Sequence, residues 1–296
     1  MQKLLLFFLV CICSLSLSAQ DDLLDLLGDE EETIEYVNAS FKTTRVINVQ
    51  SLENVAGGVL DFKISHRFGR LNSGAYELWG LDQASMRIGL DYGINDWIMV
   101  GAGRNSFQKT YDAFIKVKPL RQSIGLKKMP LSVLWYSGIT TNTFASNQNK
   151  DEDAFKFKHS LVYTNQLIIG SKISKATSIQ LSPTFVHRNL VDTRDEKNNV
   201  MILGIAGRQK LTKRIAINAE YFYILPDQVA DNITNSLSIG FDIETGGHVF
   251  QLHFTNSTSM SDNGYLTTTT GKWLDGDIHF GFNVSRVFTV KKPKKK

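Results

Sequence analysis

Cysteine is almost absent from this chain, whose 296 residues contain only Cys11 and Cys13. Both lie in an apolar N-terminal stretch that we expect to be removed from the mature protein. Neither is preceded by the small residues that usually mark a lipoprotein cysteine. The mature chain is therefore predicted to lack cysteine, which excludes disulfides, thiolate metal sites and cysteine nucleophiles.

Long hydrophobic runs are also missing. Hydrophobic residues make up 42% of the chain, but beyond the first 20 residues the apolar runs are short. None approaches the roughly 18 residues that a membrane-spanning helix needs. If the chain crosses a membrane it must do so with strands, because only helices and closed barrels satisfy their backbone groups in lipid.

A third absence is a face that carries charges of only one sign along most of the chain. The net charge is +4, and along most of the chain the charged residues alternate with apolar ones. A uniformly basic surface is absent from this pattern, so nucleic acid is not predicted as a partner.

The N-terminus has the features of a secretory signal peptide. Lys3 supplies a positive charge, residues 4–17 form an apolar core, and small residues end at Ala19. We therefore predict that residues 1–19 are the signal peptide.

Residues 20–57 are predicted to form an acidic leader followed by an irregular segment. Between Asp21 and Glu35 there are eight acidic residues and no basic one. Such a run is typical of a disordered leader, or of a short helix that docks a periplasmic partner. Residues 41–57 either constrict a barrel mouth or simply lead into the first strand.

The remaining chain alternates with the period of two that is typical of strands. Residues 83–107 show it most clearly: Met86, Ile88 and Leu90 share one face, and a turn at residues 94–96 separates two strands. Including that hairpin, about twelve strands are predicted, within residues 59–68, 83–107, 111–118, 131–139, 155–173, 178–187, 200–211, 215–225, 236–244, 248–255 and 276–290. Pro183 interrupts one of them, because it lacks a ladder donor.

The predicted connections alternate in length. On the side where the first strand starts, four of five are short (94–96, 174–177, 211–214 and 245–247, against 119–130). On the other side, five of six are long and polar (69–80, 140–154, 189–199, 226–235 and 256–275, against 105–110). Short periplasmic turns and long outer loops are typical of bacterial outer-membrane barrels, whereas a soluble sandwich has no reason for them. The prediction is an all-β, antiparallel up-and-down transmembrane β-barrel over residues 58–290, located in the bacterial outer membrane.

The C-terminus carries two features. The last strand ends in Val287-Phe288-Thr289-Val290, and an aromatic residue near this end is the usual feature that barrel-assembly machinery recognises. A basic tail of residues 291–296 follows and departs from the common form. The expected partners are therefore outer-membrane lipid and the assembly machinery.

Three segments resemble a known family. FKTTRVIN (residues 41–48), GVLDFKISHRFGRLNSGAYELWGLDQASMRIGLDYGI (58–94) and LSPTFVHRN (181–189) are similar to a Bacteroidota family of predicted membrane-bound β-barrels of unknown function. The closing FGFNVSRVF (280–288) is similar to it as well. The resemblance implies an outer-membrane barrel and carries no catalytic residues over.

Motifs for catalysis and cofactors are missing. The chain lacks HExxH, CxxCH and GxSxG, so neither a metal nor a cofactor is predicted and the protein is not expected to be an enzyme. His253, His279 and Asp277 share one face of the last two strands, where they form either a metal cluster or, more simply, polar packing. His159 and His187 lie near the outer rim, where a Ser–His pair of a lipid hydrolase would be found, but no motif supports one.

The polar faces of the strands are predicted to line the lumen. The candidate lumen-lining residues are Asp61, Lys63, Arg67, Arg87, Asp91, Lys116, Lys118, Glu220, Asp242, Glu244, His253, Asp277 and His279. Basic residues fall on the early strands and acidic ones nearer the opposite wall. If these groups are hydrated, the barrel is a passive channel or accessory barrel for a small polar solute. If they pair, it is a plugged structural or binding barrel whose acidic leader docks a periplasmic partner; an outer-membrane lipid hydrolase is the third hypothesis.

Overall fold

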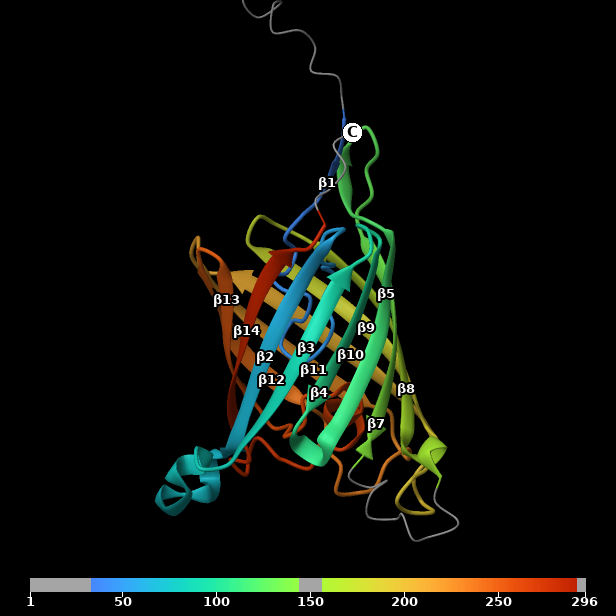
Figure 1. The fold of residues 1–296 in the computed structure, drawn as a ribbon, viewed down its shortest axis with the longest axis vertical. Helices are drawn as coiled ribbons and strands as arrows, with labels where there is room; N and C mark the ends of the chain where they lie inside the picture. The colour runs from blue at the N-terminus through green and yellow to red at the C-terminus, as the bar shows by residue number, and fades with distance from the viewer. Residues whose placement is uncertain (1–32, 144–155, 292–296) are drawn as a thin grey trace, which may run out of the picture.

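The computed structural model describes residues 33–143 and 156–291. The predicted signal peptide, most of the acidic leader and residues 292–296 of the basic tail lie outside these ranges. Within them, the chain folds into a closed barrel of twelve antiparallel strands (Figure 1). This confirms the predicted fold. Among the described residues, no helix is both long and apolar enough to cross a membrane.

The strands follow one another around the barrel in chain order, and β14 pairs with β2 to close it. Their bounds are β2 Val59–Arg70, β3 Ala84–Gly93, β4 Ile98–Asn105, β5 Thr110–Leu120, β7 Ser132–Asn142, β8 Leu161–Lys172, β9 Thr177–Arg188, β10 Asn199–Lys210, β11 Ile215–Ile224, β12 Leu237–Thr245, β13 His248–Thr255 and β14 His279–Thr289.

Two predicted strand starts are wrong. The strand predicted over 155–173 begins at Leu161, because Phe157–Ser160 form the 3₁₀ turn η4 before it. The strand predicted over 276–290 begins at His279, after a turn at Gly276 with a positive φ of 76°. At Pro183, the pairing of β8 with β9 is interrupted between Gln166↔Thr184 and Ile169↔Leu181, while the register continues unchanged.

The outer surface of the barrel is apolar. Along most strands, exposed or half-buried apolar residues alternate with buried ones, as with Ile88 and Leu90 on β3 and Leu203 and Ile205 on β10. An apolar face around a closed barrel matches a lipid environment rather than a second sheet. The chain is thus built as a membrane-bound barrel.

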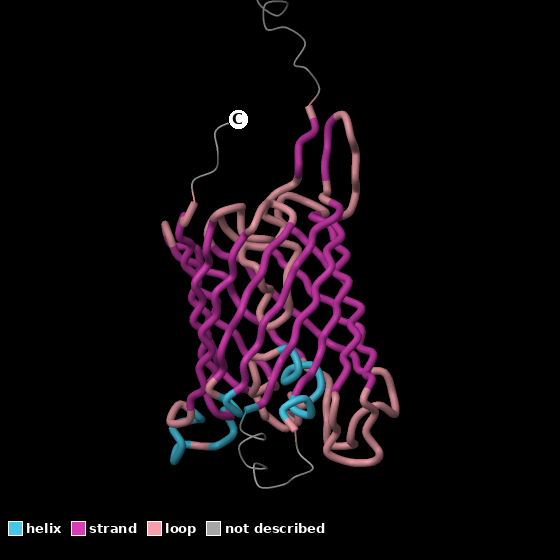
Figure 2. Tube along the Cα trace, turned by 45° about the vertical axis from the view of Figure 1, so that its right-hand side comes forward, coloured by secondary structure: helices cyan, strands magenta, loops and turns pink. Residues whose placement is uncertain are grey.

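The two ends of the barrel differ. At the terminal end, where β2 starts and β14 ends, the connections are short, except that between β5 and β7. That one contains β6 (Ser123–Gly125), which pairs with β1 (Ile34–Tyr36) to form a ribbon that projects beyond the barrel (Figure 2). The opposite end, called here the loop end, carries the 3₁₀ turns η1 Leu71–Ser73, η2 Ala75–Gly80 and η3 Phe107–Lys109, together with η4.

Candidate functional site: the occupied lumen

The lumen is occupied by the segment that precedes β2. Residues 40–52 are almost entirely buried inside the barrel (Figure 1). They form a small hairpin, in which Ser51 N donates to Thr44 O at 2.9 Å and Val46 N donates to Val49 O at 2.8 Å. The sequence left open a constriction of the barrel mouth or a simple lead into the first strand, and the segment does fold into the barrel, deeper than the mouth. Residues 40–55 are called the lumen hairpin below.

Two buried charges on well-separated strands bind the main chain of the lumen hairpin. On β5, Lys116 Nζ donates to the carbonyl oxygens of Thr44, Ser51 and Glu53 at 3.2, 3.1 and 2.8 Å. On β11, the Glu220 carboxylate accepts the backbone N–H groups of Ile47, Asn48 and Val49 at 2.9–3.1 Å. Charge-assisted hydrogen bonds of this kind are stronger than neutral ones, so the hairpin satisfies both wall charges.

Neutral side chains complete the attachment. Gln180 of β9 donates to Gln50 O at 2.8 Å, and Gln251 of β13 donates to Val46 O at 2.8 Å. The Asn48 side chain donates to Ser238 Oγ of β12 at 3.0 Å. Strands on all sides of the barrel therefore hold the hairpin, mostly through its backbone.

A second segment enters from the loop end. The connection between β13 and β14 was predicted to be an outer loop over residues 256–275, and this is wrong for its first half. Residues 256–267 are largely buried and include the helix α3 (Asp262–Thr267). Asp262 pairs with Arg45 of the lumen hairpin at 3.2 Å and accepts a hydrogen bond from Tyr136 Oη. The two inserted segments thus meet inside the barrel.

The inner surface has two different halves. From β7 to β11 the inward side chains include a group of large apolar residues, among them Leu134, Ile168, Val186, Ile202 and Phe222, which cluster with apolar residues of the hairpin and α3. This side is called the apolar half below, although polar inward residues such as Gln180 and Glu220 lie on it as well. The clustered residues of the inserted segments are Phe41, Val46, Val49, Leu52, Val55, Tyr265 and Leu266. The sequence prediction missed these apolar inward residues, because it chose its lumen candidates only among charged residues and histidines.

The polar half, on β2, β3, β5 and β12–β14, contains most of the charged groups. Arg87 donates to Asp112 through Nε at 2.9 Å and through Nη2. Gly103 of β4 faces this pair, and a Cβ there would overlap the Arg87 guanidinium. Lys63 pairs with Asp91 at 2.7 Å and with Asp61 at 3.4 Å. These five buried charges, from β2, β3 and β5, are therefore paired with one another.

Eleven of the thirteen candidate lumen residues lie buried on the inner face: Asp61, Lys63, Arg67, Arg87, Asp91, Lys116, Lys118, Glu220, Asp242, His253 and His279. Glu244 has the inward parity but lies where β12 reaches the terminal mouth, so its side chain is 42% exposed and pairs with Lys42 at 2.7 Å. The structure also uses Arg45, Asp112, Gln180, Gln251 and Asp262, which were not among the candidates. Parity could have found the three of these that lie on strands, whereas Arg45 and Asp262 lie in segments with no period.

Asp277 does not line the lumen. It precedes β14 and accepts hydrogen bonds from Arg70 at 3.0 Å and from Asn72 at 2.9 Å at the loop-end rim. The hydrogen bonds from Asn72 and from the backbone N–H of Lys272 lower the pKa of the Asp277 carboxyl below its ordinary value.

The proposed histidine cluster is not formed. His253 contacts Arg67 at 3.1 Å, and the two ring nitrogens of His279 contact Phe68 O and Thr258 Oγ1 at 2.8 and 3.1 Å. No group of three metal-ligating side chains occurs in residues 33–143 or 156–291. At the rim, His187 hydrogen bonds to Asn199 at 2.7 Å and His159 accepts the Lys156 N–H at 3.1 Å.

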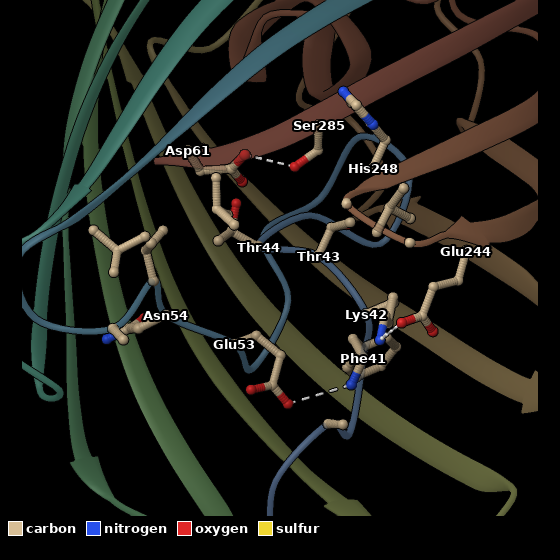
Figure 3. A pocket seen from close by; sticks show the side chains of 18 residues that line it. Phe41, Lys42, Thr43, Thr44, Glu53, Asn54, Asp61, Glu244, His248 and Ser285 are labelled. Carbon is tan, nitrogen blue, oxygen red and sulfur yellow. Dashed lines mark hydrogen bonds and ion pairs between the residues drawn. The ribbon is translucent and has the colours of Figure 1, made fainter. Parts of the chain in front are cut away.

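Three cavities lie along β2 and β14. The largest, about 520 Å³, lies at the terminal mouth between the hairpin and the wall, and is lined by Phe41, Lys42, Glu53, Asp61 and Ser285, among others (Figure 3). A middle cavity of about 10 Å³ lies among Arg45, Ser65, Arg87, Met260 and Asn283. A third, of about 350 Å³, lies at the loop end beside Arg67, Ser85 and His279.

Residues 41–288 match the family model described as "Membrane bound beta barrel domain (DUF5777)". The chain belongs to this family. No curated protein matches it significantly.

Among solved structures, the barrel is similar to an outer membrane channel from Pseudomonas putida F1 of the group COG4313, with a TM-score of 0.49 and 12% identity over 80% of this chain and 98% of that one. It is also similar to the NanC porin, with a TM-score of 0.46 and 8% identity over 78% of this chain and 98% of that one. The KdgM porin gives a TM-score of 0.45 and 7% identity over the same shares.

Proposed function

We propose that this family member is a gated channel of the bacterial outer membrane for a small polar solute, closed in the described state by its own lumen hairpin. The termini face the periplasm in this proposal, since short turns lie at their end and long connections at the other. We expect the assembly machinery to recognise the exposed Phe288 near the end of β14.

The single observation that carries the proposal is the line of cavities along β2 and β14. The inward residues of β2 reach the terminal-end cavity at Asp61, the middle cavity at Ser65 and the loop-end cavity at Arg67. On β14, Ser285 and His279 border the outer two. The three separate cavities lie in line between the two mouths, and we take this line, beside the polar inward residues of β2 and β14, as the polar route of the solute.

The route is closed at its middle. The cavity there has about the volume of one water molecule, and its walls come from both inserted segments, through Arg45 and Met260. Movement of the lumen hairpin would widen this point without opening the barrel wall. In an open porin, the apolar inward residues would face water. In a closed state held by a hairpin, they pack against the hairpin, so the apolar half of the interior favours a closed state.

Planar-bilayer conductance tests the proposal. The wild-type barrel is expected to be closed with rare openings, and the Lys116→Met/Glu220→Gln variant, which loses both main-chain anchors, is expected to open at least ten times more often. The control is Arg104→Gln, which changes an exposed side chain on the outer face that contacts Tyr111 and should behave as wild type. A loosened variant that is folded, as judged by heat-modifiable migration, yet remains ion-tight would reject the channel.

A second candidate function is a plugged barrel that docks a periplasmic partner. It is favoured by the β1–β6 ribbon, which exposes Ile34, Tyr36, Ile124 and Leu126 beyond the barrel. Exposed apolar side chains on a short ribbon are a common feature of recognition surfaces.

Site-specific photo-cross-linking at Tyr36 tests this candidate in cells. A single cross-linked protein that disappears when residues 21–35 are deleted supports docking, whereas cross-links to lipid alone argue against it. The conductance of the deletion variant separates the two candidates, because a channel without a docking role should conduct as before.

A further inference from the structure

Arg67 differs from the other buried arginines of the barrel. Arg45, Arg87 and Arg188 each pair with a carboxylate, at distances of 2.5–3.2 Å. Arg67 is 1% exposed, and within the described residues no carboxylate lies within 4.0 Å of it. A buried guanidinium without an anionic partner is costly, so binding of an anion beside Arg67 would offset the cost of burying its charge.

Its present partners are neutral or weakly basic. Nη1 donates to Ser257 O at 2.6 Å, and Nη2 contacts Asn48 Oδ1 at 2.9 Å and His253 Nε2 at 3.1 Å. The Nε–H group is buried and has no hydrogen-bond partner in the part of the chain described. Glu220 does not compensate this charge by contact, because its carboxylate binds the amides at the tip of the hairpin.

Arg67 also lines the loop-end cavity of about 350 Å³. The other polar side chains around this cavity are Arg70, Ser73, Gln83, Ser85, Thr258 and His279, and none of the lining residues is acidic. Arg70 already pairs with Asp277 at 3.0 Å, which leaves Arg67 as the uncompensated charge. Hydroxyl and amide groups beside an arginine are the usual surroundings of a bound oxyanion.

We propose that the loop-end cavity is a binding site for a small oxyanion, a carboxylate or a phosphate, and that the Arg67 guanidinium is its main contact. This inference deepens the proposed function, because it names the solute class that would enter the polar route, and it rests on that function for its purpose. The site itself requires no passage: an anion that reaches the loop end binds whether or not the hairpin moves.

Nuclear magnetic resonance line-broadening tests the site on the detergent-solubilised full barrel, with ³¹P signals of inorganic phosphate and ¹³C signals of labelled succinate. The wild type is expected to broaden at least one probe in a saturable way. Arg67→Gln should weaken the apparent affinity at least ten-fold, and Arg67→Lys, which keeps the charge, should retain more than Arg67→Gln. Arg104→Gln is the matched control, since Arg104 is exposed and contacts Tyr111 on the outer face, and it should bind as wild type.

Two results would overturn the site: no saturable broadening by the wild type, or equal broadening by wild type and Arg67→Gln. If Arg67→Gln does not fold, Arg67→Lys replaces it, because lysine keeps the charge but loses the planar fork of donors; a several-fold loss of affinity is expected, and no loss would count against the site. Saturable binding in a barrel that never conducts would reject the channel but keep the anion site. Conduction without binding would reject only the site.

Discussion

At the scale of single residues, the lumen of this barrel is organised by side chains that bind backbone. Lys116 binds only carbonyl oxygens of the hairpin and Glu220 binds its N–H groups. Each charge is 0–1% exposed, so each would be buried without a partner if the hairpin were absent and water did not replace it. The same two residues therefore account for the position of the hairpin inside the lumen.

Glu220→Gln is expected to loosen the tip of the hairpin. The substitution removes the negative charge and replaces one of the two acceptor oxygens with an NH₂ donor, which cannot accept a hydrogen bond from the backbone N–H groups. The expected cost is about 1.5–3 kcal/mol. Backbone amide exchange at Ile47, Asn48 and Val49, measured by mass spectrometry in detergent, should become roughly 10–100-fold faster. Glu244→Gln, at the exposed mouth, is the control and should leave exchange unchanged; equal rates in both variants would contradict the role of Glu220.

The Asp277 carboxylate gives the loop end a defined response to acid. Its folded-state pKa lies below its ordinary value, so its contacts stabilise the rim above that ordinary value and are lost as the pH falls through the lowered pKa. Amide exchange at Lys272, corrected for intrinsic pH dependence, should therefore rise at acidic pH. In Asp277→Asn the corrected rate should be raised at neutral pH and change little with acid; the same acid response in both proteins would rule out Asp277 as its source.

At the scale of elements, the strands were largely predictable and the inserted segments were not. Period-two alternation identifies β2, β3 and β13 because one face meets lipid and the other does not. The charged candidates followed from the same parity, apart from Asp277, which fell in a turn. The hairpin and α3 have no period, and their burial depends on contacts with strands far away in the chain, such as Arg45 with Asp262.

The apolar half of the interior illustrates the same limit. Leu134 and Ile168 point inward, yet a strand with apolar residues on both faces gives no alternation to read. The hairpin and α3, which cluster with them, explain why such residues are tolerated inside a barrel. The available signal in the sequence is a set of strands that are apolar on both faces together with an irregular segment that is also apolar. That combination predicts that the segment is inserted into the barrel.

The junction between the hairpin and the barrel depends on Gly93 at the end of β3. A Cβ at this position would overlap the main-chain oxygens of Val55 and Ala56, so Gly93→Ala should displace residues 55–57 and destabilise the fold by about 1–3 kcal/mol. Denaturant unfolding followed by heat-modifiable migration measures this. Gly247→Ala, which has no atom within 4 Å of the new Cβ, should be neutral, and equal midpoints for both would contradict the close approach.

At the scale of the whole molecule, the barrel has an apolar exterior and a filled interior, with three cavities along β2 and β14. The exterior predicts that the mature protein requires detergent or lipid to remain monomeric. A monomer that is soluble in plain buffer would contradict the membrane-bound barrel. The interior predicts that movement of the lumen hairpin, rather than of the wall, decides whether a solute can pass.

Cross-linking the hairpin to the wall tests that claim most directly. Asn48 and Ser238 hydrogen bond at 3.0 Å, so Asn48→Cys/Ser238→Cys, joined by oxidation or by a short thiol-specific linker, should hold the hairpin in place in a chain predicted to have no other cysteine after processing. The measurement is bilayer conductance of this pair in the Lys116→Met/Glu220→Gln background, before and after reduction. Openings that stop on cross-linking and return on reduction are the expected result, and equal conductance in the linked and reduced states would show that the hairpin is not the gate.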